Sequence, residues 1–330
     1  MHKALPVRLT TVVVVLFAVL ALAAGGGSDT KDPLELVPAR ANLLSGADLQ
    51  TMLYDADLES AFGLIAAADP GMPQTLAELL VEAQSTIGVD LTSAGTALVF
   101  ADVSDGLDYV GFIASGEFDR DEVFAATQAA NTDGTYIEET YNEELMLVID
   151  ANDDQDDSAS AIVAGTFVIG SVDAVRDVID VADGAAALGG DVLAFYKGLG
   201  DVWAKVALAV PADATDDLGD TGALALPFDL GSLLEVEMLG VIADRDIDDV
   251  IVRLVAGYAT EALATETAET LDALLPNLIG DDSLTAFTDG LSVTSSGTQA
   301  TLEFRSSIQE ALENIDSAAD TLGGSAGIGL

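Results

Sequence analysis

The residues with the clearest potential for chemistry lie in an acidic stretch from Asp150 to Ser158, where oxygen-bearing side chains recur at alternate positions. These positions are Asp150, Asn152, Asp154 and Asp156. Carboxylate and amide oxygens at this spacing are the ligands of an EF-hand calcium loop. Two positions depart from that pattern, since Gln155 replaces the glycine of the sharp turn and Ala161 replaces the closing glutamate. Two interpretations therefore stay open, a calcium site and a solvated acidic loop.

Two further acidic groups have the same ambiguity. One is a turn-rich loop, with Asp213, Asp216, Asp217 and Asp220. The other follows a predicted strand, with Asp244, Asp246, Asp248 and Asp249. We interpret the second group as a strand-end turn. Five arginines are predicted to form surface ion pairs, with Arg176 placed to clamp a carboxylate; they are Arg120, Arg176, Arg245, Arg253 and Arg305.

The missing residue types exclude whole classes of enzyme. The chain has no cysteine, and its one histidine is His2. A protein that has lost its first residues therefore has no thiol nucleophile, no Ser-His-Asp triad and no histidine-ligated zinc. Asp220-Thr221-Gly222 matches an aspartic-protease motif, but no second copy supplies the partner carboxylate. We predict a protein that is not an enzyme, with a carboxylate-based hydrolase as an alternative.

The elements that must position these residues are hairpins alternating with amphipathic helices. Hairpins are expected at 97–115, 136–149, 161–170 and 291–304, with further strands at 202–210, 234–243 and 250–256. Helices are expected to begin at Asp48, Asp119, Ser171 and Ser307, and another spans 260–275 and ends at Pro276. This order predicts an α+β fold of antiparallel hairpins with helices packed on one face.

The two halves of the chain end in the same way, with a hairpin, a serine and an amphipathic helix. The segments 161–176 and 291–308 show this order, which suggests a degenerate internal duplication. We therefore expect two related lobes, at 34–189 and 190–320, divided at a linker formed by Gly189 and Gly190. Residues 25–33 are expected to form a glycine-rich tether, and residues 321–330 a flexible tail.

The first residues indicate export. Lys3 and Arg8 precede an apolar run from Val12 to Ala24, which ends in small residues. This is typical of a secretory signal peptide, and the run falls short of the about 18 residues of a confident membrane span. Residues 1–24 are therefore predicted to be a signal peptide or an uncleaved anchor, and the protein is expected outside the cytoplasm, secreted or tethered at the cell envelope.

The charge of the chain limits its partners. With 57 acidic and 11 basic residues, the formal net charge is −46. Nucleic acid and anionic membrane surfaces are excluded because both require clustered lysine and arginine. Cations, an unidentified protein or a small ligand are the expected partners, and a membrane only through the N-terminal segment. No cofactor is expected other than calcium. So much acid on a chain that is 50% hydrophobic favours a folded, salt-adapted protein.

Three segments resemble a known group of proteins: Leu34 to Asn42, Gly116 to Asp119, and Gly165 to Arg176. The resemblance is to an uncharacterised family of exported bacterial and archaeal envelope proteins, many of which are lipoproteins. It implies an envelope location and a two-lobed α+β build, and it brings no functional residue. The sequence thus predicts an exported binding or scaffold protein that is not an enzyme, with a calcium-dependent module as the first alternative and a hydrolase as the second.

Overall fold

The computed structural model describes residues 32–48, 95–104, 108–130, 135–150, 157–211, 235–246, 249–278 and 290–307, with isolated positions between 55 and 81 and at 309. Its strands are β1 (Leu43–Asp48), β2 (Thr96–Asp102), β3 (Tyr109–Ser115), β4 (Thr135–Tyr141), β5 (Glu144–Asp150), β6 (Ser158–Val163), β7 (Thr166–Ser171), β8 (Ala204–Ala209), β9 (Met238–Asp246), β10 (Asp249–Gly257), β11 (Leu291–Ser296) and β12 (Gln299–Ser307).

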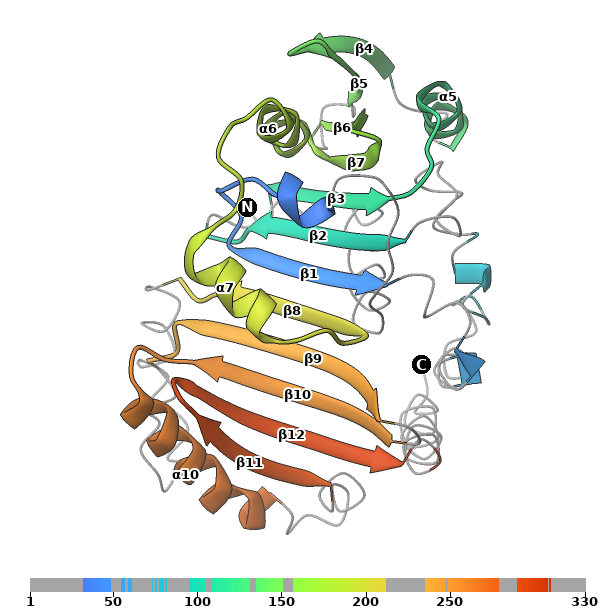
Figure 1. Ribbon diagram of the computed structural model, residues 1–330. Helices are drawn as coiled ribbons and strands as arrows, with labels where there is room; N and C mark the ends of the chain where they lie inside the picture. The colour runs from blue at the N-terminus through green and yellow to red at the C-terminus, as the bar shows by residue number, and fades with distance from the viewer. Residues whose placement is uncertain are drawn as a thin grey trace, which may run out of the picture.

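All these strands belong to one antiparallel sheet of 12 strands, ordered β11-β12-β10-β9-β8-β1-β2-β3-β7-β6-β5-β4 (Figure 1). Strands β1–β7 make up one end of the sheet and β8–β12 the other. The two ends join where β1 pairs with β8, with Leu44 opposite Ala207. The α+β class predicted from the sequence is therefore correct.

The helices of the described chain are η1 (Pro33–Leu36), a 3-10 turn, and α5 (Arg120–Ala130), α6 (Val172–Ala182), α7 (Gly190–Gly198) and α10 (Glu261–Leu278). None of them combines the length and hydropathy needed to cross a membrane within the part of the chain that is described.

Helices lie against both sides of the sheet, not one side as the sequence suggested. A Cβ built on Gly240 would meet Phe195 and Leu199 of α7, so α7 covers the side to which Gly240 faces (Figure 1). Helix α10 instead packs Ala264 and Ala268 on Ala300 of β12, which faces the other way by strand alternation. We call these the α7 side and the α10 side. The physical reason is that the central strands carry apolar residues on both faces.

The strands around β2 and β3 are buried on both sides of the sheet. On the α7 side, Leu44, Phe100 and Ile113 are fully buried beneath a layer that includes α6 and η1. On the α10 side, Ala97, Ala101 and Phe167 are equally buried. A strand buried on both faces reads as a continuous apolar run, which is the pattern of 97–101.

Most predicted elements are confirmed within a few residues, including the helix start after Ser307, where β12 ends and Gln309 is helical, and three details are wrong. Asp48 ends strand β1 and does not begin a helix. Pro276 lies within α10, which continues to Leu278. Gly189 and Gly190 are not a linker, because they begin α7, a helix that the sequence analysis missed.

Candidate binding face

The apolar face is a group of side chains on the α10 side of strands β8–β12. It consists of Val206, Leu208, Leu239, Val241, Val252, Leu254, Leu302 and Phe304. Register aligns these side chains in rows. Val206 lies opposite Val241, Val241 opposite Leu254, and Leu254 opposite Leu302. Directly opposed residues of antiparallel strands have Cβ atoms about 5 Å apart, so each row is a continuous apolar band.

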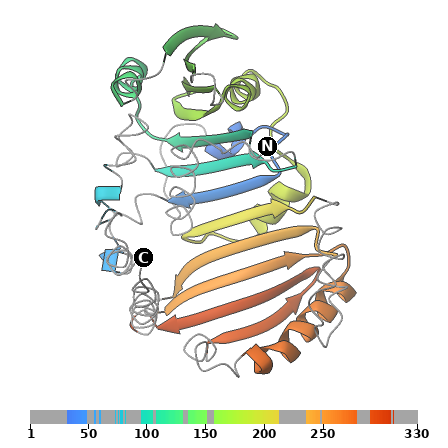
Figure 2. The same cartoon turned by 180° about the vertical axis from the view of Figure 1, so that it is seen from behind.

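This face is not covered at its centre. Leu239 is 43% exposed, Val241 37% and Leu254 50%, and the rest of the group is only half-buried. The three exposed residues lie on the adjacent strands β9 and β10, which Figure 2 shows from behind (Figure 2). Burial of one leucine side chain is worth about 2 kcal/mol, so a contiguous exposed group of this kind is unfavourable in water.

Helix α10 marks the end of the apolar face. It covers Ala256, on the same strand as Leu254, and Val293 and Ala300 on β11 and β12. Its sequence contains no lysine or arginine, and it has four exposed acids, Glu261, Glu266, Glu269 and Asp272. At the start of β9, Glu237 is exposed two residues before Leu239, and its backbone continues the ladder to Gly257 and Val210. The face is therefore flanked by the acid Glu237 and by a helix with acids and no cation.

Cations of these strands lie mostly on the opposite side. Lys205, Arg253 and Arg305 all alternate onto the α7 side. On the α10 side of β8–β12, Arg245 is the one cation among the described residues, and its guanidinium lies 2.7 Å from the carboxylate of Asp55.

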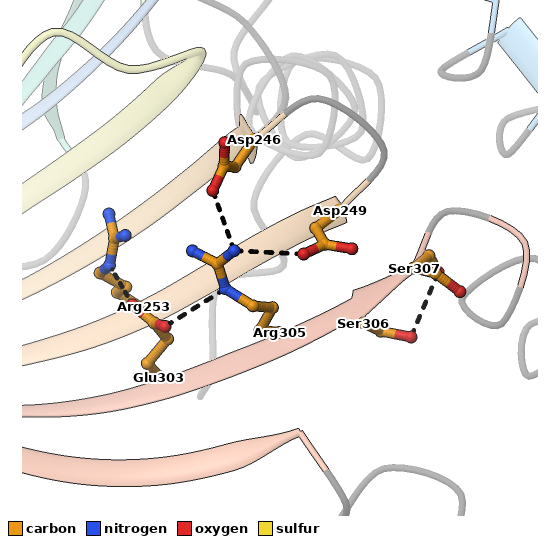
Figure 3. Close-up of polar contacts among 7 residues, drawn as sticks. All are labelled: Asp246, Asp249, Arg253, Glu303, Arg305, Ser306 and Ser307. Atoms are coloured by element: carbon orange, nitrogen blue, oxygen red, sulfur yellow. Dashed lines mark hydrogen bonds and ion pairs between the residues drawn. The ribbon is translucent and has the colours of Figure 1, made fainter.

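A cluster of ion pairs lies on the α7 side of strands β9, β10 and β12. We call it the ion-pair cluster. Arg305 donates to Asp246 at 2.9 Å and to Asp249 at 3.1 Å, and Arg253 donates to Glu303 at 2.6 Å (Figure 3). Arg305 also lies 3.7 Å from Glu303. The hydrogen bonds to Asp246 and Asp249 raise the pKa of Arg305 above its ordinary value.

This ion-pair cluster has no free carboxylate pair for acid–base work, because each of its acids faces an arginine. Within the described residues, no group of three or more acids or histidines is arranged to hold a metal ion. The cluster ties the end of β9 and the start of β10 to β12, while the predicted strand-end turn between Asp246 and Asp249 lies outside the described residues.

A second polar network joins α6 to the N-terminal strands. Tyr109 donates to Asp177 at 2.9 Å, and the guanidinium of Arg40 stacks over the Tyr109 ring at 4.3 Å. Arg40 also pairs with Asp102 at 3.1 Å. Burial, supported by the hydrogen bond to Asp177, raises the pKa of Tyr109 far above its ordinary value. The network keeps Tyr109 neutral beneath the helix, which is a structural role.

The proposed calcium loop lies largely outside the described residues. Asp150 is the last residue of β5, and the structure describes neither its side chain nor Asn152, Asp154 and Asp156. The loop with Asp213, Asp216, Asp217 and Asp220 also lies outside, together with the Asp220-Thr221-Gly222 motif. These predicted sites therefore lie outside the described residues.

The predicted ion pairs of the arginines are present. Arg176 donates from one nitrogen to both carboxylate oxygens of Glu139, at 2.8 and 3.1 Å, and so clamps α6 to β4. Arg120 pairs with the adjacent Asp121 at 3.3 Å. Each of these cations is engaged by acid of this chain.

Sequence reasoning missed the apolar face. The segment 250–256 is apolar at every position except Arg253, so periodicity alone does not identify which side is covered. The sequence of β12 does indicate an apolar face, because Ala300, Leu302 and Phe304 alternate with the polar residues Thr301, Glu303 and Arg305.

A scan against protein-family models and a search of curated proteins both give no match to this chain. Among solved structures, crystal form I of TP0453 is similar, with a TM-score of 0.46 and 10% identity over 88% of this chain and 99% of that chain. Crystal form III of TP0453 gives 0.45 and 10%, over 88% and 100%. Crystal form IV gives 0.44 and 9%, over 86% and 96%.

Proposed function

We propose that this is an exported binding protein without enzymatic activity, whose apolar face receives a partner or ligand outside the cytoplasm. The observation that carries this proposal is the exposure of Leu239, Val241 and Leu254 on adjacent strands of an otherwise acidic protein. An antiparallel sheet with one solvated polar face normally packs its other face on an apolar layer. Here β12 presents Thr301, Glu303 and Arg305 on the α7 side, while the α10 side of the neighbouring strands is incompletely covered.

The acidic surface fits this role in salt-rich surroundings. At a net charge of −46, self-repulsion opposes compaction in dilute buffer. Salt shortens the Debye length from about 10 Å at 0.1 M to about 3 Å at 1 M and so relieves that repulsion. Apolar contacts do not weaken in this way, which makes an apolar binding face suited to a salt-adapted protein.

We further propose that the sheet consists of two related lobes that arose by duplication. The strand order β1-β2-β3-β7-β6 parallels β8-β9-β10-β12-β11. In each set, three consecutive strands are followed by a helix and then by a hairpin whose second strand returns beside the third. The hairpin of 161–170 thus corresponds to that of 291–304, which is the pair that the sequence likeness selected. Strands β4 and β5 are additions to the first lobe.

The binding proposal is tested with an apolar dye that becomes fluorescent in a water-poor site. The full chain is titrated with the dye and compared with the variants Leu254→Ser and Ile137→Ser. The two residues are a matched pair, because each is 50% exposed and Ile137 lies far away on β4. We expect Leu254→Ser to remove most of the emission and Ile137→Ser to leave it unchanged. Equal emission from all three proteins would refute the proposal.

A further inference from the structure

We infer that the apolar face binds a cationic amphipathic helix of a partner protein, which lies beside α10 on the same side of the sheet. This inference rests on the proposed binding function and names the class of partner. It is carried by three features: the width of the uncovered strands, the way α10 already packs, and the charge of the border.

The dimensions suit one helix. Neighbouring strands are about 4.8 Å apart, and a helix with its side chains is about 10 Å wide, so one helix covers about two strands. Helix α10 packs on β11 and β12 in this way. The exposed residues Leu239, Val241 and Leu254 occupy the next two strands, β9 and β10. These strands have nine residues each, about 30 Å at 3.4 Å per residue.

The charge of the border selects a cationic partner. The exposed Glu237 lies at one end of the face, and α10, which packs beside the face, carries four exposed acids and no lysine or arginine. The one described cation on this side, Arg245, is paired with Asp55. A helix with leucine or valine on one face and lysine or arginine along its flanks would therefore meet both an apolar floor and an acidic rim.

The same charge disfavours other occupants. A second copy of this chain would bring a further net charge of −46 to the interface. A membrane surface with anionic lipid would also be repelled. We therefore assign the face to a basic protein segment. Binding of a second copy of the chain or of a membrane is a different outcome, which the experiment distinguishes.

The experiment uses the full chain and a synthetic peptide of 18 residues, the length of α10, with leucine on one face and lysine on the other. A control peptide has glutamate in place of each lysine. Binding is measured by fluorescence anisotropy at low and high salt. We expect the lysine peptide to bind, to displace the apolar dye and to bind about tenfold more weakly to Leu254→Ser than to Ile137→Ser. The glutamate peptide should not bind.

Two matched variants test the acidic rim. Glu237→Lys and Asp108→Lys change the net charge equally, and both residues are exposed, but Asp108 lies before β3 in the other half of the sheet. Glu237→Lys should weaken binding of the lysine peptide several-fold, whereas Asp108→Lys should not. Equal effects of the two variants, or of Leu254→Ser and Ile137→Ser, would show diffuse attraction to an acidic surface and would overturn the inference.

The remaining outcomes separate this inference from the proposed function. If the dye binds at Leu254 and the lysine peptide does not, the inference is wrong and the binding proposal stands. If neither binds, both are wrong. A dimer in sedimentation that is lost in Leu254→Ser, or protection of the face by phosphatidylcholine vesicles in place of the peptide, would replace the partner helix with a second copy or a membrane.

Discussion

The guanidinium of Arg305 lies 3.1 Å from the carboxylate of Asp249, across the ladder that joins β12 to β10. The same nitrogen reaches Asp246, so Arg305 joins the end of β9 to the start of β10. In a chain with so few cations, each such contact offsets local repulsion between acids.

Replacement of Arg305 should destabilise the protein, and the loss of stability should depend on the salt concentration. In Arg305→Ala, three carboxylates lose their shared partner, and we expect the thermal midpoint to fall by about 2–4 °C in dilute buffer. The loss should shrink at 1 M salt, because repulsion between the acids is then screened. The control is Arg120→Ala, whose arginine pairs only with its exposed neighbour Asp121 in the described structure. Equal losses at both salt concentrations would contradict this explanation.

The close approach of α7 to the sheet depends on Gly46. A Cβ at this position would overlap the hydroxyl of Tyr196 and lie 2.8 Å from Leu98. Gly46→Ala should therefore lower the free energy of unfolding by about 1–3 kcal/mol, the usual cost of overpacking. Tyr196→Phe removes the overlapping hydroxyl and should restore part of that loss in the double variant. Urea unfolding measures both effects.

The matched control for this prediction is Gly198→Ala, at the last residue of α7. A Cβ at Gly198 meets nothing within 4 Å. Its effect on stability should be near zero or slightly favourable, because alanine has the higher helix propensity. If Gly198→Ala lowered the free energy of unfolding as much as Gly46→Ala, the glycines would matter for the conformation of the chain and not for packing.

Stability should fall at alkaline pH. Burial raises the pKa of both Tyr109 and Tyr196 in the folded protein, whereas unfolded tyrosine ionises near pH 10. A raised folded pKa contributes stability that is complete below the unfolded value and is lost as the pH rises above it. Urea midpoints measured upward from pH 9 should therefore decline, and Tyr196→Phe should flatten the decline. A flat profile in the unmodified protein would contradict the burial of these rings.

Sodium chloride should raise the thermal midpoint smoothly, and calcium should add nothing beyond magnesium at equal ionic strength. This is expected if the acidic loops serve solvation, and Asp154→Asn should then have almost no effect. A midpoint that rises with millimolar calcium alone, and no longer does so in Asp154→Asn, would instead establish the calcium-dependent module.

The strands were predictable because local signals and tertiary structure agree. The hairpin β6–β7 turns at Ala164 and Gly165, both with positive φ, and glycine at this point marks the turn in the sequence. The helix α5 begins where Asp119 accepts from the backbone N–H of Glu122, as its capping box indicates. Such signals act over a few residues and require no knowledge of the rest of the fold.

Features that depend on distant partners were not predictable. Helix α7 begins and ends with glycine, so its propensity is low, and it forms because Phe195 and Leu199 pack on Gly240 of the sheet. Likewise, Leu36 and Val37 are buried although the segment reads as a simple extended entry. The apolar face was missed for the same reason, because coverage of a strand is a property of the whole sheet.

The most direct test of the binding face uses the absence of cysteine, since a single introduced thiol can be labelled without interference. Maleimide labelling rates are measured on the full chain for Leu254→Cys, for Ile137→Cys as an exposed reference and for Ala207→Cys as a buried one. The face that we describe predicts that Leu254→Cys reacts at about the rate of Ile137→Cys. A rate as slow as that of Ala207→Cys would mean that the face is covered in solution, and the proposed function would be wrong.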